Sequence, residues 1–298
     1  MKLPIGLVGL LLATAASSAQ VTLSQVQPVP QTVTSAEELN RYAADQWLYG
    51  SAEGSVATRQ AFGALIDHAL RVARHRPRWS VVLATGSSPL GTRGVSFVPC
   101  GAKPMAAVFD ADETLIWNIP PRRDNVLHNN AKFDPRVWNA WERTGAGYAT
   151  PIPGAAETFA ALRRVGITPI VNTNRSADNP EGTIATLKAA GLGHFAVGRT
   201  LFLQHGHEGK DARRVAISAR YCVIAMAGDQ LGDFSDAFNA PDLTPAQRRA
   251  AAITGPASRL WGRGWFLLAN PSYGPWQAKL RFEDIYGTDQ WVPPKGAQ

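Results

Sequence analysis

One stretch constrains the fold more than any other: an apolar run at residues 105–109 that leads into Asp110 and Asp112. The run MAAVF has no polar side chain, which is typical of a strand buried on both faces of a parallel sheet. In open α/β sheets, ligands bind beyond the carboxyl ends of the strands. A pair of carboxylates at that point is expected to hold a metal ion, to attack a substrate, or to do both.

The chain beyond this stretch alternates between strand and helix patterns. Apolar runs end near residues 174, 229 and 270, and helical spacing lies between them at about 155–166, 180–191 and 211–220. This alternation predicts parallel βαβ units, and therefore an α/β fold. Residues 35–76 also show helical spacing, whereas residues 77–104, rich in Gly, Ser and Pro, are expected to form a long irregular connection.

Composition limits the classes of protein that the chain can be. With 298 residues, 45% of them apolar and 18% charged, it is long and apolar enough to fold as one large domain or two small ones. A net charge of +7 suits a phosphorylated substrate, a nucleic acid or a membrane surface, and it equally serves solubility alone. The basic residues at 71–78 have no interleaved aromatics on a recognisable module, so no nucleic-acid partner is expected.

The N-terminal segment has the pattern of an export signal. Lys2 precedes an apolar run at residues 3–15, and small residues at 17–19 form a cleavage site. We therefore expect a signal peptide at residues 1–19, a linker at residues 20–34, and a periplasmic or secreted protein. The run is shorter than the roughly 20 residues of a membrane span. No cysteine follows it to carry a lipid, so no stable membrane anchor is expected.

The chain has two cysteines, Cys100 and Cys222. Export would allow them to form a disulfide. Cys222, however, lies in an apolar run that is typical of a central strand, where a cysteine is often a small buried residue. Both alternatives stay open on the sequence alone.

Polar residues stand at the ends of further predicted strands. Thr173 and Asn174 end the second strand, and Asp229 ends the third, with Asp233 four residues later. Lys210 directly precedes a predicted helix. Each feature alone is weak, because such residues are also common as caps, turns and solvated side chains. Together with the aspartate pair they supply a nucleophile, an acid or base, donors for a phosphate and a metal site.

Several short motifs follow one another along the chain in a fixed order. They are FDADETLIWN (109–118), FDPRVWNAW (133–141), IPGAAETF (152–159), TNR (173–175), K-x-x-R-R (210–214), GDQLGDF (228–234) and ANPSYGPWQ (269–277). This series resembles the haloacid dehalogenase (HAD) superfamily, and within it the class B/C acid phosphatases and the bacterial outer-membrane lipoprotein 5′-nucleotidases. The resemblance covers about residues 35–280. It departs at Gln230 and Ala269, where Asn and Pro are usual, in the length of residues 77–104, and in the missing lipobox cysteine.

The resemblance implies a fold: a HAD-like Rossmannoid parallel sheet sandwiched by helices, with a smaller helical cap. The phosphatase core is then expected at residues 105–280, with an aromatic-rich cap insert at about 118–150. Residues 35–104 would contribute helices to the cap and a connection. Residues 281–298 would form a C-terminal tail.

The resemblance also implies chemical roles. Mg²⁺ is expected to be held by Asp110, by Asp229 and by the backbone carbonyl of Asp112, with Asp233 in or near the outer sphere of the ion. Asp110 would attack phosphorus and form an aspartyl-phosphate. Asp112 would protonate the leaving alkoxide and then deprotonate the hydrolytic water, which favours an acidic pH optimum or a raised pKa.

Binding roles follow from the same resemblance. Thr173, Asn174 and Lys210 are expected to hold the phosphoryl oxygens. Trp138 and Tyr273 match positions where aromatics of the nucleotidase-like relatives stack on a base or ring. The expected function is therefore an exported, Mg²⁺-dependent acid phosphatase that acts on small phosphate monoesters, 5′-nucleotides or similar ring-bearing compounds first among them.

Alternatives remain at this point. The site could serve non-nucleotide esters or phosphotransfer, and the scaffold could persist as a catalytically silent storage or binding protein. The charge of the chain also leaves a basic nucleic-acid-binding protein open. His205 and His207 are expected to lie in a surface loop rather than to bind metal. The sequence does not give the oligomeric state.

Overall fold

The computed structural model describes residues 42–91, 93–128 and 133–286. The expected signal peptide at 1–19 and the linker at 20–34 lie outside the described residues. Among the described residues, no helix combines the length and the apolar content needed to cross a membrane.

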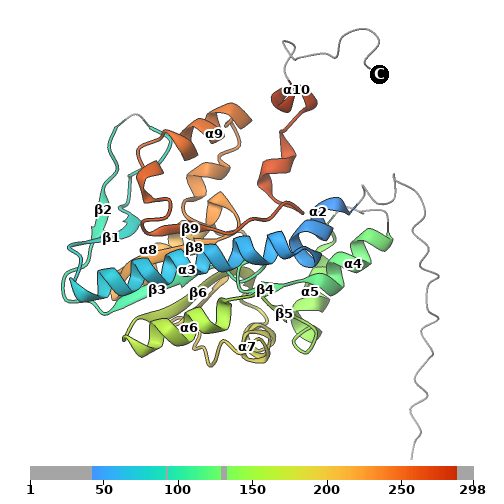
Figure 1. The fold of residues 1–298 in the computed structure, drawn as a ribbon, viewed down its shortest axis with the longest axis horizontal. Coiled ribbons are helices and arrows are strands. Elements are labelled where there is room, and N and C mark those ends of the chain that lie inside the picture. Colours follow the sequence, from blue (N-terminus) through green and yellow to red (C-terminus); the bar gives the residue numbers. More distant parts are fainter. Residues whose placement is uncertain (1–41, 92, 129–132, 287–298) are drawn as a thin grey trace, which may run out of the picture.

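A five-stranded parallel sheet forms the centre of the molecule, with the strand order β7-β6-β3-β8-β9 (Figure 1). Its strands are β3 (Met105–Phe109), β6 (Thr168–Ser176), β7 (Leu201–Gln204), β8 (Cys222–Gly228) and β9 (Trp265–Leu267). The apolar run at 105–109 is the middle strand, and it pairs with β6 on one side and β8 on the other. The predicted α/β class is therefore confirmed.

The middle strand is buried on both faces because its side chains alternate between two separate cores. Ala107 and Phe109 belong to one apolar cluster, and Ala106 and Val108 to the other. Helices α3, α6 and α7 contribute to the first cluster, and α8 and α9 to the second. Their bounds are α3 (Ala52–Arg74), α6 (Ala155–Arg164), α7 (Pro180–Ala189), α8 (Lys210–Arg220) and α9 (Pro245–Ile253).

Residues 77–104 are more regular than the sequence indicated, and the predicted irregular connection is wrong there. An antiparallel pair forms between β1 (Trp79–Leu83) and β2 (Phe97–Pro99). Val81 and Val82 in β1 are buried, because they pack in the core under α8 and α9. The many Gly, Ser and Pro residues lie in the segment between the two strands. They dominate the composition of residues 77–104, so the short apolar run of β1 does not stand out in the sequence.

The insert after the middle strand contains two helices, α4 (Ile119–Leu127) and α5 (Pro135–Thr144). It leaves and rejoins the core through a short antiparallel pair, β4 (Ile116–Trp117) with β5 (Thr150–Pro151). Helix α5 begins sharply because Asp134 accepts a hydrogen bond from the backbone N–H of Arg136 at 2.8 Å. In Figure 1, α4 and α5 lie together at the end of the molecule beside β4 and β5.

The N-terminal helical segment also contacts this insert. Asp45 lies in α2 (Ala43–Asp45), which continues into the π-helical turn η1 (Gln46–Gly50). Its carboxylate forms an ion pair with Arg122 of α4 at 2.8 Å and accepts a hydrogen bond from Ser272. Three segments distant in sequence therefore meet at one buried carboxylate. The remaining short elements are η2 (Leu231–Asp233), η3 (Asp236–Asn239), η4 (Ser258–Leu260), η5 (Pro275–Ala278) and α10 (Phe282–Ile285).

Cys100 and Cys222 form a disulfide, with their Cα atoms 4.6 Å apart. The bond ties the chain just after β2 to the first residue of β8. It resolves the alternative that the sequence left open, and both sulfur-bearing residues are fully buried. Burial in a central strand, which favoured an unpaired residue, is compatible with pairing because the partner is buried beside it.

Candidate active site

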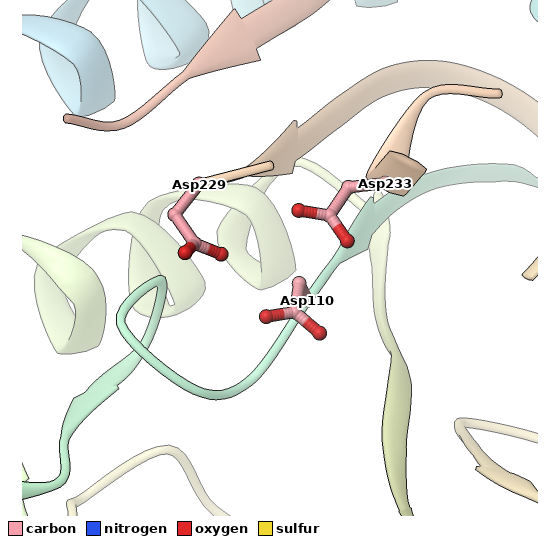
Figure 2. A group of neighbouring side chains, drawn as sticks. All are labelled: Asp110, Asp229 and Asp233. Atoms are coloured by element: carbon pink, nitrogen blue, oxygen red, sulfur yellow. The ribbon is translucent and has the colours of Figure 1, made fainter. Parts of the chain in front are cut away.

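Three aspartates meet at the carboxyl edge of the sheet. Asp110 directly follows β3, Asp229 directly follows β8, and Asp233 ends η2. One carboxylate oxygen from each lies within 4.8 Å of the others. Figure 2 shows the three side chains converging on a common space. All three are buried.

The fold places two of these carboxylates through strand register. Phe109 and Ala227 are partners in the parallel β3–β8 ladder, and the backbone N–H of Asp110 donates to Ala227 at 2.9 Å. Asp110 and Asp229, each the first residue after its strand, therefore lie at the same end of the sheet and one residue apart in register. The third carboxylate arrives through a tight turn that packs on Gly228, where a Cβ atom would lie 2.2 Å from the Asp233 side chain.

Lys210 is the buried cation of this cluster, with 5% of the residue exposed. It begins helix α8, and its ammonium group donates hydrogen bonds to Asp110 and, at 2.6 Å, to Asp233. Burial lowers its pKa, but the neighbouring carboxylates outweigh burial and raise it, so the side chain is charged. Three carboxylates and one ammonium carry a formal charge of −2 when all are ionised.

Without a further cation, this negative charge is unfavourable. Burial raises the pKa of Asp110 well above its ordinary value, and the nearby Asp233 and Asp229 raise it further against the influence of Lys210. Burial, followed by the charge of Asp233, raises the pKa of Asp229 to about 7. A divalent cation with a preference for oxygen ligands would balance the two excess charges, so the donor set fits Mg²⁺.

Asp112 lies outside this cluster. Its carboxylate accepts hydrogen bonds from the Arg175 guanidinium, the shortest at 2.7 Å, and from the Asn118 amide at 2.9 Å. The side chain is separate from the three carboxylates of the cluster, and its role in proton transfer stays a prediction. Coordination of a metal by its backbone carbonyl stays a prediction.

Glu113 is a residue that the sequence reasoning missed. It is almost fully buried, has a positive φ of 54°, and accepts hydrogen bonds from Tyr49 at 3.2 Å, from Tyr273 and from the backbone of Asn118 at 2.8 Å. Burial is the main cause that raises its pKa, to about 8. The only sequence signal was a carboxylate in the same loop as Asp110 and Asp112.

The predicted phosphate-binding residues lie at the carboxyl end of β6 and the start of α8. Thr173 is fully buried, and its hydroxyl accepts from the backbone N–H of Arg175 at 3.2 Å. Asn174 is exposed, and its side-chain oxygen accepts from Arg213 at 2.6 Å. Lys210 already contacts Asp110. The structure brings Lys210 into the carboxylate cluster, and it places Thr173 and Asn174 at the same edge of the sheet.

The two predicted stacking residues are both half-buried and fixed at their polar tips. The Trp138 indole N–H donates to Glu142 at 2.6 Å, and the Tyr273 hydroxyl donates to Glu113. Tyr273 is also tied to the carboxylate cluster, because Gln230 donates to its backbone carbonyl at 3.0 Å and to Asp229 at 2.8 Å. Substrate stacking by either ring stays a prediction.

His205 and His207 lie in the exposed turn between β7 and α8, and neither belongs to the carboxylate cluster. This placement agrees with the surface loop that the sequence indicated.

Comparisons with known proteins were consistent with this geometry. The model of the family described as HAD superfamily, subfamily IIIB (Acid phosphatase) matches residues 92–276. The structure is similar to that of the class C acid phosphatase from Bacillus anthracis, with a TM-score of 0.65 and 20% identity over 84% of this chain and 89% of that one. The same enzyme with tungstate bound gives a TM-score of 0.63 and 22% identity over the same shares. No curated protein sequence matches the chain.

The raised pKa of Glu113 predicts a pH-dependent contribution to stability. The folded-state pKa of about 8 lies above the ordinary value of 4.5, so the folded protein binds more protons than the unfolded chain between these values. The stabilising contribution is complete below pH 4.5 and is lost as the pH rises to about 8, at up to about 1.4 kcal/mol per pH unit.

Urea unfolding of the wild type and of Glu113→Gln at several pH values, in EDTA, measures this contribution. As the pH rises, the free energy of unfolding of the wild type should fall relative to that of Glu113→Gln. The contributions of the other titrating groups are common to both proteins and cancel in this difference. A part of the difference that does not vary with pH reflects the hydrogen bonds that the substitution alters. A difference that does not vary with pH would show that folding does not raise the pKa of Glu113.

Proposed function

Because this chain belongs to the acid phosphatases of HAD superfamily subfamily IIIB, and is therefore a phosphoric monoester hydrolase, we propose that it is a Mg²⁺-dependent enzyme that acts through an aspartyl-phosphate. The observation that carries the proposal is the cluster of Asp110, Asp229 and Asp233 around the Lys210 ammonium. Three carboxylates that could bind a metal and a buried cation lie at one edge of the sheet, which supports the proposal that Asp110 acts there as the nucleophile.

The residues of the chain divide the reaction between them. A carboxylate oxygen of Asp110 attacks phosphorus, and the bond from phosphorus to the ester oxygen breaks. Asp112 gives its proton to that departing oxygen, then takes a proton from the water that hydrolyses the aspartyl-phosphate. Thr173, Asn174 and Lys210 donate hydrogen bonds to the phosphoryl oxygens. A bound Mg²⁺ would neutralise the phosphate dianion, held by Asp110 and Asp229 with Asp233 beside them.

The tungstate-bound relative supports an oxyanion site. Tungstate is a tetrahedral oxyanion, as phosphate is, and the solved Bacillus anthracis enzyme holds it on a similar fold. We propose that the carboxyl end of this sheet, where the aspartates meet, receives the phosphoryl group. The Thr173 hydroxyl in β6 and the Lys210 ammonium at the start of α8 are groups that can donate to an oxyanion, and they support this placement.

We propose 5′-nucleotides or similar ring-bearing monoesters as the substrates. Trp138 and Tyr273 are far apart in the sequence, and both side chains are half-buried. The indole N–H of Trp138 donates to Glu142, and the hydroxyl of Tyr273 donates to Glu113. Fixed aromatic rings suit stacking, because little side-chain entropy is then lost on binding. Stacking of a base on such a ring is worth about 1–3 kcal/mol.

We propose that the enzyme is exported. The apolar N-terminal segment expected to be a signal peptide is one support. The disulfide between Cys100 and Cys222 is another, because such bonds form and persist in oxidising compartments. Both suit the periplasm or the extracellular space.

The first test concerns the nucleophile and the metal. Asp110→Asn should lower the rate of phosphate release by about 10³-fold or more, because the amide cannot form the acyl phosphate. EDTA should suppress the wild type, and added Mg²⁺ should restore it. Asp242→Asn, at an exposed aspartate, is the matched control and should keep full activity. Turnover close to wild type in folded Asp110→Asn, or full activity in EDTA, would contradict the proposal.

The second test concerns substrate choice. Trp138→Ala should reduce kcat/KM for a nucleoside 5′-monophosphate about 5- to 150-fold more than for a sugar phosphate without an aromatic ring. Trp138→Phe keeps a ring but loses the hydrogen bond to Glu142, so it should retain most of the nucleotide preference. Equal losses on the two esters would remove the stacking role and favour a phosphatase for non-nucleotide substrates.

A further inference from the structure

Arg175 is a buried cation to which the proposed reaction assigns no role. It follows Thr173 and Asn174 in β6, and only 1% of the residue is exposed. We propose that Arg175 is a positioning residue that fixes the carboxylate of Asp112 for proton transfer. The inference rests on the proposed function, and it adds a determinant of how well the enzyme cleaves esters with poor leaving groups.

The guanidinium of Arg175 donates hydrogen bonds to the Asp112 carboxylate through two of its nitrogen atoms. Arg175 Nη2 lies 2.7 Å from Asp112 Oδ1, and Arg175 Nε lies 3.0 Å from Oδ1 and 3.2 Å from Oδ2. A planar guanidinium that donates two N–H groups to one carboxylate restricts its rotation, which a single-point donor such as lysine does not.

Asn118 completes the arrangement. Its amide nitrogen donates to Asp112 Oδ1 at 2.9 Å, and its amide oxygen accepts from Arg175 Nη2 at 3.1 Å. Asp112 Oδ1 therefore accepts from three donor atoms, whereas Oδ2 has the single longer contact to Arg175 Nε. Oδ2 is the carboxylate oxygen that accepts fewer hydrogen bonds and can still bind a proton. The geometry therefore points to Oδ2 as the atom that carries the transferred proton.

The solvent exposure of the pair agrees with this division. The Asp112 side chain is 16% exposed, whereas the Arg175 side chain is 1% exposed. The carboxylate thus reaches the surface of the site while the guanidinium holds it from behind. Substrate can approach Asp112 without contacting Arg175, which is why Arg175 acts through its neighbour.

The cap insert closes over the other side of Arg175. The guanidinium carbon lies 5.9 Å from the centre of the Trp138 ring on α5. Glu142, one turn later in α5, accepts from the Trp138 indole and, at 3.0 Å, from the backbone N–H of Ser176 in β6. Helix α5 is therefore tied to the strand that carries Arg175, and the insert supports the orientation of Asp112.

The proposal predicts a dependence on the leaving group. When Asp110 bonds to phosphorus and the ester bond breaks, an alkoxide needs the proton from Asp112 Oδ2, whereas an aryl oxide with electron-withdrawing substituents departs as a stable anion. Loss of positioning should therefore harm alkyl esters far more than activated aryl esters. The parameter kcat/KM isolates this step, because it excludes the later hydrolysis of the aspartyl-phosphate.

The experiment compares glycerol phosphate with 2,4-dinitrophenyl phosphate in the full-length, Mg²⁺-supplemented enzyme. Arg175→Gln should lower kcat/KM about 10²- to 10³-fold for the alkyl ester and less than about 10-fold for the aryl ester. Arg175→Lys keeps the charge but not the planar guanidinium, so it should recover only part of the loss. The matched control is Arg163→Gln, which removes a guanidinium that bonds to Leu192 and lies over the Phe159 ring, and it should affect both esters equally and little.

A double-mutant cycle separates positioning from a structural role. In the Asp112→Asn background, Arg175→Gln should cause almost no further loss on the alkyl ester, because the group that it positions is already inactive. If Arg175→Gln does not fold, Arg175→Lys carries the same comparison with a smaller effect. Equal losses on both esters, or losses that add fully to those of Asp112→Asn, would overturn the inference alone. A wild type that hydrolyses neither ester would overturn the proposed function itself.

Discussion

The site depends on an excess of buried negative charge at the carboxyl edge of the sheet. Asp110, Asp229 and Asp233 face one another with a single ammonium, Lys210, among them. Burial makes each ionised carboxylate costly, which is why the pKa values of Asp110 and Asp229 are raised. A divalent cation would balance the excess negative charge and leave Asp110 ionised, as its proposed role as nucleophile requires. The same cation would attract a phosphate dianion to a site that is otherwise negative.

Two buried cations contact different carboxylates of the site. Lys210 contacts Asp110, the proposed nucleophile, and Arg175 contacts Asp112, the proposed acid and base. The two contacts are anchored to different parts of the fold. Strands β3 and β8 set the position of Asp110 and Asp229, whereas β6 carries Arg175 and helix α5 of the insert lies against it. In the proposed mechanism, the sheet therefore positions the nucleophile, and the insert contributes to the position of Asp112.

Sequence patterns predicted the parts of the structure that depend on local order along the chain. An apolar run followed by Asp110 indicated the middle strand and its functional end, and the alternation of strands and helices indicated the parallel sheet. The β1–β2 pair was missed because its apolar run is short and is followed by many turn residues. Glu113 and Arg175 were missed as site residues because their roles arise from contacts with Tyr49, Tyr273 and Asp112, which no spacing in the sequence reveals. The disulfide likewise joins residues 122 positions apart.

Calorimetric titration of the full-length protein with Mg²⁺ measures binding at the carboxylate cluster without depending on any substrate. We expect one ion per chain and an affinity that increases between pH 5.5 and 7.5. Protons should be released on binding, because the ion competes with the proton on Asp229, whose pKa is about 7. Asp229→Asn should bind much more weakly. No binding, or an affinity that is the same at both pH values, would contradict a site built on buried carboxylates in need of a cation.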